Sequence, residues 1–393
     1  MKYVDEFRDG TLAAGLARAI AREVDRGRDY AFMEFCGGHT HAISRYGVAD
    51  LLPANVRMIH GPGCPVCVLP IGRVDMAIGL ALARPEVILC TYGDCLRVPA
   101  SEGLSLLKAK ARGADVRMVY SAADALALAV REPAREVVFF AIGFETTTPP
   151  TALVLRQAAA QGLANFSVIC NHVLTPPAIA AILGAPEVRR LGSVPIDGFI
   201  GPAHVSTLIG SRPYEAFAAQ YRKPVVIAGF EPLDVMQAIL MLVRQVNDGR
   251  AEVENEFTRA VSRDGNAKAQ AVVAEVLELR PSFEWRGLGA LPDSALRIRS
   301  AFAAWDAEAK FGLEDRPVAD NRACECGAIL RGVKQPVDCK LFATACTPEN
   351  PMGSCMVSSE GACAAHYNYG RFRDVPVRVV DNSAPPNPDQ ETA

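Results

Sequence analysis

Short runs of apolar, β-prone residues recur between residues 31 and 228 of the chain. Most runs start about 30 residues after the previous one, which is the length of a repeating βα unit. Alanine-rich stretches with helical spacing lie between them. The runs are residues 31–35, 56–60, 86–91, 115–120, 136–142, 166–170, 197–200 and 224–228.

This pattern predicts an α/β fold with two parallel-sheet, Rossmann-like domains of about four strands each. We expect the first domain to span residues 30–130 and the second to span residues 131–232. Nearly every run leads into polar or glycine-rich residues, and ligands of open α/β sheets bind beyond the carboxyl ends of the strands. The two sheets are therefore expected to face each other across one central cleft.

The pattern changes outside this region. The N-terminal residues and much of 233–310 have helical spacing, whereas residues 314–372 are rich in Cys, Gly and Pro with little periodicity. Such composition is typical of a segment organised by a metal. We expect residues 1–29 and 233–381 to form a third, mostly helical and irregular domain that holds an iron–sulfur cluster. Residues 382–393 are expected to be a disordered tail.

Composition and charge narrow the function classes. The chain has 393 residues, 22% of them charged, and a formal net charge of −3, which argues against binding nucleic acid or an anionic membrane through bulk charge. The longest uncharged stretch, residues 157–186, contains consecutive prolines and reads poorly as a membrane span. Residues 1–10 lack the apolar core of a secretory signal. We expect a cytoplasmic monomer that forms transient complexes.

Twelve cysteines indicate metal or redox chemistry, because a reducing cytosol disfavours structural disulfides. Six of them are irregularly spaced near the C-terminus, which favours a [4Fe–4S] cluster over a zinc site built from two tight C-x2–4-C pairs. A cluster needs four thiolates, and the other two thiols could exchange electrons with it as a dithiol. Spacing alone does not select the four. The six are Cys324, Cys326, Cys339, Cys346, Cys355 and Cys363.

Three further cysteines follow predicted strands. Gly37 and Gly38 after Cys36 would let backbone amides approach a bound group, and a thiolate there suits iron or zinc. The alternative is that Cys36 is a buried, inert cysteine rather than a metal ligand. Cys64 and Cys67 form a C-x-x-C pair, which is typical of redox thiols and also of zinc knuckles.

His39, Asp94, His204 and Glu360 are further candidates, for orienting ligands or moving protons. His39 could instead face solvent beside Cys36, and His204, which follows a predicted strand, could equally be a satisfied buried side chain. Asp94 could instead cap a helix. The sequence contains no P-loop, dinucleotide-binding or serine-hydrolase motif.

Several motifs, in order along the chain, resemble the HypD family of hydrogenase maturation proteins. The resemblance runs from about Tyr30 to Tyr369, with departures at Ala203, where the family pattern leads us to expect glycine, and at Cys95, where the family commonly has another residue. The motifs are residues 35–41 (FCGGHTH), 61–67 (GPGCPVC), 143–147 (GFETT), 339–342 (CKLF) and 355–363 (CMVSSEGAC).

The resemblance implies a scaffold on which the Fe(CN)2CO part of the [NiFe]-hydrogenase active site is assembled, so that the hydrogenase large subunit is served indirectly. HypC is the implied partner chaperone, and HypE, charged by HypF, is the implied cyanide donor. Cys36 would bind iron together with the N-terminal cysteine of HypC, and Cys64 and Cys67 would be the dithiol of the cleft.

The family also resembles ferredoxin–thioredoxin reductase, which pairs a [4Fe–4S] cluster with an adjacent disulfide. By this resemblance Cys326 and Cys355 would be the redox pair, passing two electrons to the cleft dithiol to remove sulfur from a thiocyanate. Two other interpretations stay open: a stand-alone [4Fe–4S] disulfide reductase, and a zinc-stabilised binding module. The implied cluster ligands are Cys324, Cys339, Cys346 and Cys363.

Overall fold

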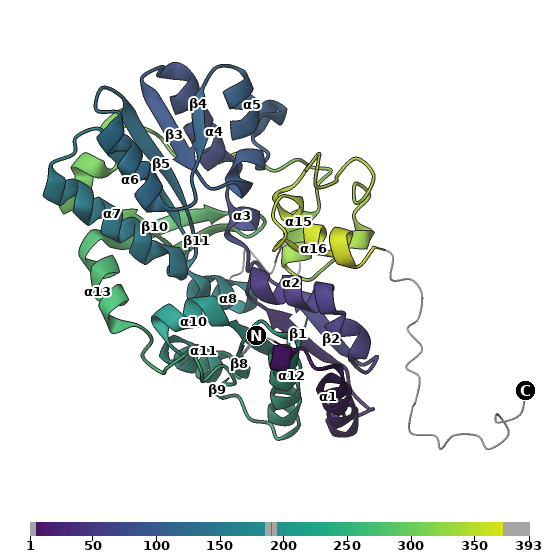
Figure 1. Cartoon of the computed structure of the whole chain (residues 1–393). Helices are drawn as coiled ribbons and strands as arrows, with labels where there is room; N and C mark the ends of the chain where they lie inside the picture. Colours follow the sequence, from purple (N-terminus) through teal and green to yellow (C-terminus); the bar gives the residue numbers. More distant parts are fainter. Residues whose placement is uncertain (1–4, 185–189, 191–194, 372–393) are drawn as a thin grey trace, which may run out of the picture.

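Two parallel β-sheets form the framework of the computed structural model, which describes residues 5–184, 190 and 195–371 (Figure 1). Sheet A has the strand order β2-β1-β7-β8-β9, and sheet B has the order β4-β3-β5-β6. The predicted α/β fold with two parallel sheets is thereby confirmed. Sheet A contains β1 (Tyr30–Glu34), β2 (Val56–His60), β7 (Gly198–Pro202), β8 (Val225–Ala228) and β9 (Val253–Asn255). Sheet B contains β3 (Val87–Thr91), β4 (Asp115–Met118), β5 (Glu136–Gly143) and β6 (Phe166–His172).

Strands β1 to β8 match the predicted apolar runs to within two residues at either end, whereas β9 was not predicted. Strands β3 and β6 are buried along their whole length, as expected for parallel strands covered by helices on both faces. Helices α1 and α12 pack against sheet A, and helices α6 and α7 lie along sheet B (Figure 1).

The sheets do not follow the predicted division at residue 130. The chain leaves sheet A after β2, builds all of sheet B, and then returns to add β7, β8 and β9 to sheet A. Register explains why: β1 pairs with β2 on one side and with β7 on the other. Each βα unit has the same spacing whichever sheet it joins, so periodicity predicts the strands but not their partners.

Most of the longer helices fall where helical spacing was found, whereas the helices within residues 314–371 lie in a segment with little periodicity. Helix α13 ends ten residues after it begins, and the chain then continues as a strand. The helices are α1 (Gly10–Glu23), α2 (Gly37–Tyr46), α3 (Pro65–Val68), α4 (Ile71–Ala83), α5 (Leu106–Ala111), α6 (Ala122–Arg131), α7 (Thr148–Gln161), α8 (Thr175–Gly184), α10 (Ala203–Ile209), α11 (Arg212–Tyr221), α12 (Pro232–Asn247), α13 (Ala267–Val276), α14 (Ala307–Phe311), α15 (Cys326–Leu330) and α16 (Ala362–Tyr369).

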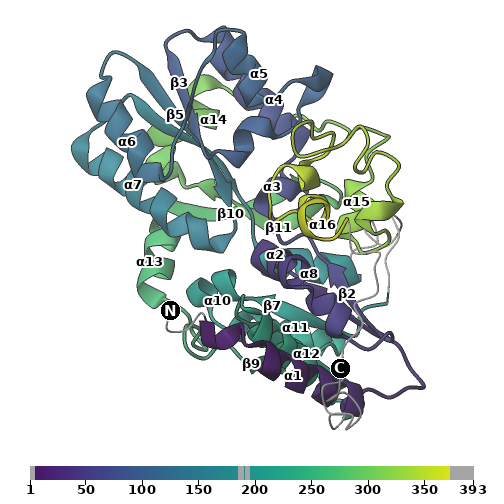
Figure 2. The same cartoon turned by 45° about the vertical axis from the view of Figure 1, so that its right-hand side comes forward.

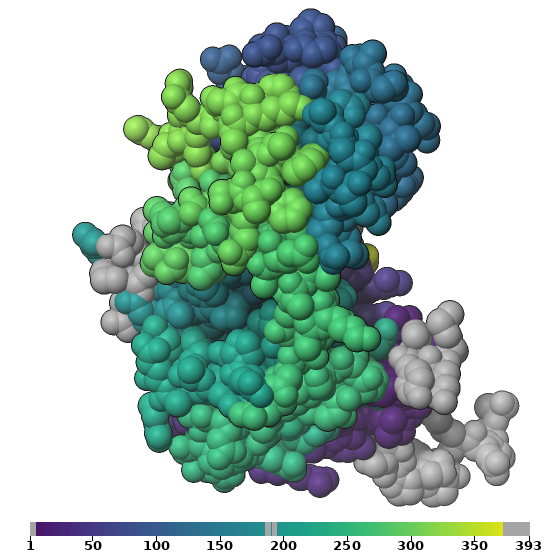
Figure 3. Space-filling view, turned by 90° about the vertical axis from the view of Figure 1, so that its left-hand side faces the viewer, coloured from purple at the N-terminus to yellow at the C-terminus, as the bar shows by residue number. Residues whose placement is uncertain are grey.

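The expectation that residues 233–310 are mostly helical misses an antiparallel hairpin, β10 (Leu277–Trp285) and β11 (Gly289–Ile298). Its apolar residues alternate with charged ones and are interrupted by two prolines, Pro281 and Pro292, which hides the two-residue period. The hairpin packs on β6 and α8, and green residues of this part of the chain lie at the molecular surface in Figure 3.

The cysteine-rich segment lies beside α2 and α3, where both sheets end (Figure 2). It contains only short helices joined by turns, and α16 packs on α2. The predicted disordered tail, residues 382–393, lies outside the described residues, as do residues 372–381 of the predicted third domain.

Candidate functional site

A cleft of about 550 Å³ lies where the carboxyl ends of strands from both sheets meet the cysteine-rich segment. It brings together residues from four of the five motifs, all except residues 339–342, and these motifs are far apart in the sequence. The predicted candidates that line it are Cys36, Cys64, Asp94, His204 and Glu360.

Cys36 sits at the end of β1, in extended backbone immediately before α2. Its backbone N–H donates to the buried Glu34 carboxylate at 3.0 Å, and its Sγ lies 4.0 Å from His204 Nδ1. Burial, followed by the negative charge of Glu360, raises the pKa of the Cys36 thiol. The site therefore keeps Cys36 protonated until a cation or a base displaces the proton.

Glu34 and His60 support Cys36 and were missed by sequence analysis. The Glu34 carboxylate also accepts a bond from the Thr40 hydroxyl and lies 2.9 Å from His60 Nδ1. Strands β1 and β2 place Glu34 directly beside His60. A fully buried carboxylate ending an apolar strand was the available signal, because such a group requires polar partners.

Gly37 and Gly38, predicted to approach a bound group, instead lie against side chains. A Cβ on Gly37 would clash with Glu360, and a Cβ on Gly38 would lie 2.6 Å from the Phe230 ring. The Gly37 amide already donates to the carbonyl of Gly63. Both glycines thus permit the tight packing around Cys36.

His39 does not line the cleft. Its side chain is buried, with Nε2 3.0 Å from the carbonyl oxygens of Ala228 and Gly229. Phe230 lies between this ring and that of His204, with centroid separations of 4.9 and 4.1 Å. Burial lowers the pKa of both histidines, so His39 ties α2 to the end of β8 as a neutral ring.

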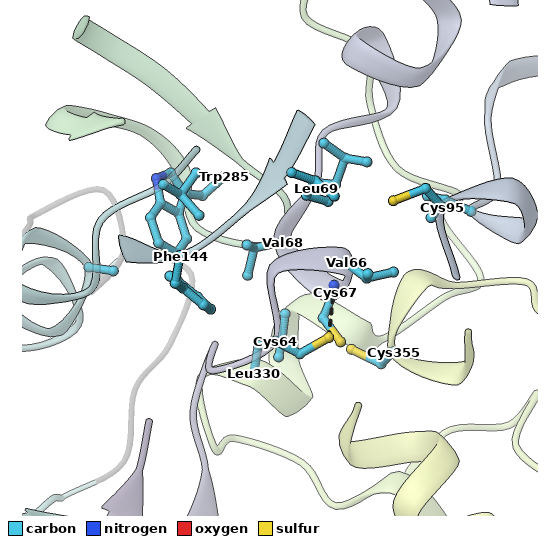
Figure 4. Close-up of a cluster of buried hydrophobic side chains, with 14 of the residues drawn as sticks. Cys64, Val66, Cys67, Val68, Leu69, Cys95, Phe144, Trp285, Leu330 and Cys355 are labelled. Carbon is cyan, nitrogen blue, oxygen red and sulfur yellow. Dashed lines mark hydrogen bonds between the residues drawn. The ribbon is translucent and has the colours of Figure 1, made fainter. Parts of the chain in front are cut away.

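The C-x-x-C pair spans the single-turn helix α3. The Cys64 sulfur accepts the backbone N–H of Cys67 at 3.4 Å and faces the cleft, whereas Cys67 is completely buried on the other side. Cys67 and Cys355 point their sulfurs toward each other (Figure 4). Burial holds the pKa of Cys67 well above its usual value.

The C-terminal thiols form a second group, which we call the cysteine pocket. Five of them line it together with apolar side chains, among them Ile329, Leu341, Phe342 and Met356. Cys355 lies outside the pocket, and its thiol contacts those of Cys67, Cys326 and Cys363. The pocket cysteines are Cys324, Cys326, Cys339, Cys346 and Cys363.

A continuous series of thiol contacts therefore runs from the pocket to the cleft, in the order Cys326, Cys355, Cys67 and Cys64. All twelve cysteines are free thiols. In the described part of the chain, no three His, Cys, Asp or Glu side chains converge on a position for a single metal ion.

Glu360 and Asp94 face Cys36 from the cysteine-rich segment and from sheet B. Burial, and then the charges of Asp94 and Glu34, raise the pKa of Glu360. Asp94 is more exposed and lies 3.8 Å from Arg97. Glu360 is thus the candidate that holds a proton close to Cys36.

Comparison with known proteins identifies the family. The family model described as "HypD: Hydrogenase formation hypA family" matches residues 11–370. The chain belongs to the HypD family. It is 74% identical over 377 residues to hydrogenase maturation factor HypD of Cupriavidus necator, covering 96% of this chain and 99% of the relative.

More distant relatives extend the same match. The hydrogenase maturation factor HypD of Rhizobium leguminosarum bv. viciae is 70% identical, covering 97% of this chain and 98% of the relative. That of Escherichia coli K12 is 46% identical, covering 94% and 98%. Within the described residues, no helix is long and apolar enough to cross a membrane.

Proposed function

We propose that the chain is a hydrogenase maturation factor that carries a resident [4Fe–4S] cluster and assembles an Fe(CN)2CO unit as its cargo. The observation that carries the proposal is the series of thiol contacts joining the cysteine pocket to the cleft. The names of the relatives support the maturation role. We place this work in the cytoplasm, where free thiols persist.

The donor set of the cysteine pocket fits the proposed cluster. Soft thiolates in apolar surroundings are the usual ligands of iron–sulfur clusters, and the described residues lining this pocket include no carboxylate or imidazole. When bound, the cluster would supply single electrons. We assign Cys326 and Cys355 as the dithiol beside it, as the family resemblance implies, and the contact of Cys355 with Cys67 supports the role of Cys355. The proposed ligands are Cys324, Cys339, Cys346 and Cys363.

The cleft dithiol would release cyanide from a thiocyanate carried by a partner protein. The Cys64 thiolate attacks the thiocyanate sulfur, and cyanide leaves with the electron pair of the S–C bond. Cys67 then attacks the Cys64 sulfur, which releases the partner's thiolate and closes the Cys64–Cys67 disulfide. Two electrons have then passed from the dithiol to the broken S–C bond.

Thiol exchange would restore the cleft dithiol. Cys355 attacks the Cys67 sulfur and releases the Cys64 thiolate, and Cys326 then attacks Cys355 and releases the Cys67 thiolate. The Cys326–Cys355 pair becomes a disulfide and awaits two electrons. Burial of Cys67 and Cys355 excludes outside thiols from these steps.

Cys36 would hold the iron cargo in the cleft that Cys64 also lines. Ferrous iron with cyanide and carbonyl ligands favours a thiolate ligand in dry surroundings, and Cys36 is only 7% exposed. His204 faces its sulfur, and the raised pKa of Glu360 makes that carboxyl the natural proton store beside it. Loading of iron would displace the thiol proton.

Partner proteins would dock over the mouth of the cleft. Tyr120, 86% exposed, and the half-exposed Met118 line or border this mouth and offer apolar contact area. We propose HypC as the partner that shares the iron with Cys36, and HypE as the donor of the thiocyanate. The chain is proposed to be a monomer that enters these heterocomplexes.

A stand-alone [4Fe–4S] disulfide reductase is the second candidate. The buried contacts between Cys67 and Cys355 favour it equally, because both functions need the same exchange. It gives no role to Cys36, Glu34 and His204, which the cleft arranges together. Detection of iron with cyanide and carbonyl ligands would favour the maturation scaffold over the reductase.

Infrared spectroscopy of the full chain, purified without oxygen from cells that contain the other maturation proteins, tests this proposal. Cyanide and carbonyl stretching bands should be present in the wild type and lost in Cys36→Ala. The matched control is Cys90→Ala, which removes a fully buried cysteine of β3 outside the cleft. A cluster chromophore without diatomic bands in any preparation would favour the reductase.

A further inference from the structure

Two hydrogen bonds join the C-x-x-C helix to Ser354, the residue before Cys355, and to a hairpin tip that contacts the residue after Cys326. We propose that Ser354 and the tip of the β10–β11 hairpin, residues 285–289, are positioning elements that hold Cys67 in register with Cys355 for thiol exchange. This inference rests on the proposed relay and assigns a role to two elements that the relay itself does not use.

The end of α3 explains why the two bonds are needed. A helix of one turn leaves its last carbonyl groups without partners inside the helix, and Pro70 prevents its continuation. The Ser354 hydroxyl donates to the Cys67 carbonyl at 2.6 Å, and the backbone N–H of Arg286 donates to the Val68 carbonyl at 2.8 Å. Two consecutive carbonyls are thus satisfied from other parts of the chain.

One donor is next to a member of the proposed redox pair, and the other lies on the hairpin tip that reaches the second member. Ser354 immediately precedes Cys355 in the sequence and is completely buried. The hydrogen bond therefore fixes the backbone of Cys67 relative to the residue beside Cys355. Because buried polar groups lose much free energy when unpaired, this single bond constrains both segments.

The hairpin tip reaches Cys326 through a contact between two glycines. Gly287 has φ +82°, and a Cβ on it would lie 2.6 Å from the Cα of Gly327, the residue after Cys326. The Arg331 guanidinium donates to the Gly287 carbonyl and closes this contact. A side chain at Gly327 would therefore push α15 away from the hairpin.

The packing behind α3 supports the same role. Trp285, at the start of the tip, is fully buried against Phe144, with Val68 between these rings and Cys67 (Figure 4). Gly361 closes the other side, since a Cβ there would lie 3.0 Å from the Cys67 sulfur. Cys67 is thus held on both sides while its sulfur stays in contact with Cys355.

Disulfide mapping tests the inference. The anaerobic full chain is treated with limiting diamide, which takes two electrons and two protons from a thiol pair and becomes the hydrazine. The thiols are then blocked with N-ethylmaleimide, and the Cys67–Cys355 linkage is quantified by peptide mass spectrometry. Ser354→Ala should lower its yield about tenfold, the order of effect expected from one lost buried hydrogen bond, and Ser354→Thr should restore it to about half or more.

Ser206→Ala is the matched control, because this buried serine also donates to a backbone carbonyl, that of Pro202, at 2.7 Å. It should leave the linkage unchanged. Gly327→Ala alters the contact between α15 and the hairpin tip, and it should lower the yield of the Cys67–Cys355 linkage as Ser354→Ala does. If Ser354→Ala does not fold, Gly327→Ala tests the positioning role in its place.

The outcomes separate this inference from the relay. A wild-type linkage that both variants leave unchanged overturns the positioning role and leaves the relay intact. A wild type that forms no Cys67–Cys355 linkage, although Cys64–Cys67 oxidises readily, overturns the relay and the positioning role together.

Discussion

The two groups of cysteines are held in place by different kinds of structure. Cys36 and Cys64 follow neighbouring parallel strands, whose register fixes where each chain segment leaves the sheet. The cysteine pocket is built on turns and short helices, and its thiols are among its main internal contacts. The difference teaches that the cleft thiols keep their positions through backbone pairing, whereas the proposed cluster would hold the pocket thiols in place.

Removal of iron should reveal the difference between the two regions most clearly. Anaerobic chelation is expected to increase amide hydrogen exchange in residues 353–369 by more than about tenfold, because the bound metal would contribute the folding free energy of that segment. Exchange in β5 should change by less than about twofold. Equal effects on both regions would contradict the contrast.

Core truncation should destabilise the protein more in sheet B than in the cysteine pocket. Phe140→Ala removes a fully buried ring from β5 and should lower the free energy of unfolding by about 3–5 kcal/mol. Leu341→Ala, at the half-buried edge of the cysteine pocket, should cost about 1–2 kcal/mol. Chemical denaturation of both variants in iron-free protein measures the difference, and equal losses would refute it.

The free energy of unfolding should depend on pH through Glu145, which follows β5 of sheet B. Burial raises the pKa of Glu145 to about 7 from its usual 4.5, so the folded chain binds this proton more tightly than the unfolded chain does. The stabilisation is complete below pH 4.5 and is lost as the pH rises through about 7.

Glu145→Gln should remove that dependence. The free-energy difference between wild type and variant is expected to change by up to about 3 kcal/mol across this window. The Glu145 carboxylate accepts two bonds from Thr175, which the glutamine oxygen can partly retain. Denaturation between pH 5 and 8 measures the effect, and parallel curves for the two proteins would show that Glu145 stays ionised.

The difference between the sheets and the cysteine-rich segment also explains which features sequence analysis could predict. Apolar runs such as residues 136–142 specify strands locally, so the parallel-sheet fold was predictable. The return of β7 to pair with β1 was not, because strand pairing depends on which faces are buried together. Glu34 and His60 were missed for the same reason, since only the register of β1 and β2 makes them neighbours.

In the cysteine-rich segment, the arrangement of the thiols could not be predicted from the sequence. Its six thiols could be recognised from composition, but no period in the sequence indicates that Cys355 lies outside the pocket and against Cys67. The grouping of redox pair and ligands came from the family resemblance. The hairpin that ties these parts together was also missed, because Pro281 and Pro292 interrupt its alternation.

The most direct test of the relay is a reduction experiment on cluster-loaded protein that holds the Cys64–Cys67 disulfide. After limiting dithionite, thiol labelling should find Cys64 and Cys67 reduced in the wild type and in the control Cys170→Ala, a buried cysteine that bonds to the Leu296 carbonyl. In Cys355→Ala the cluster should bleach while the Cys64–Cys67 disulfide persists. The disulfide should also persist in iron-free wild type. Reduction of the disulfide in Cys355→Ala at the wild-type rate would contradict the relay.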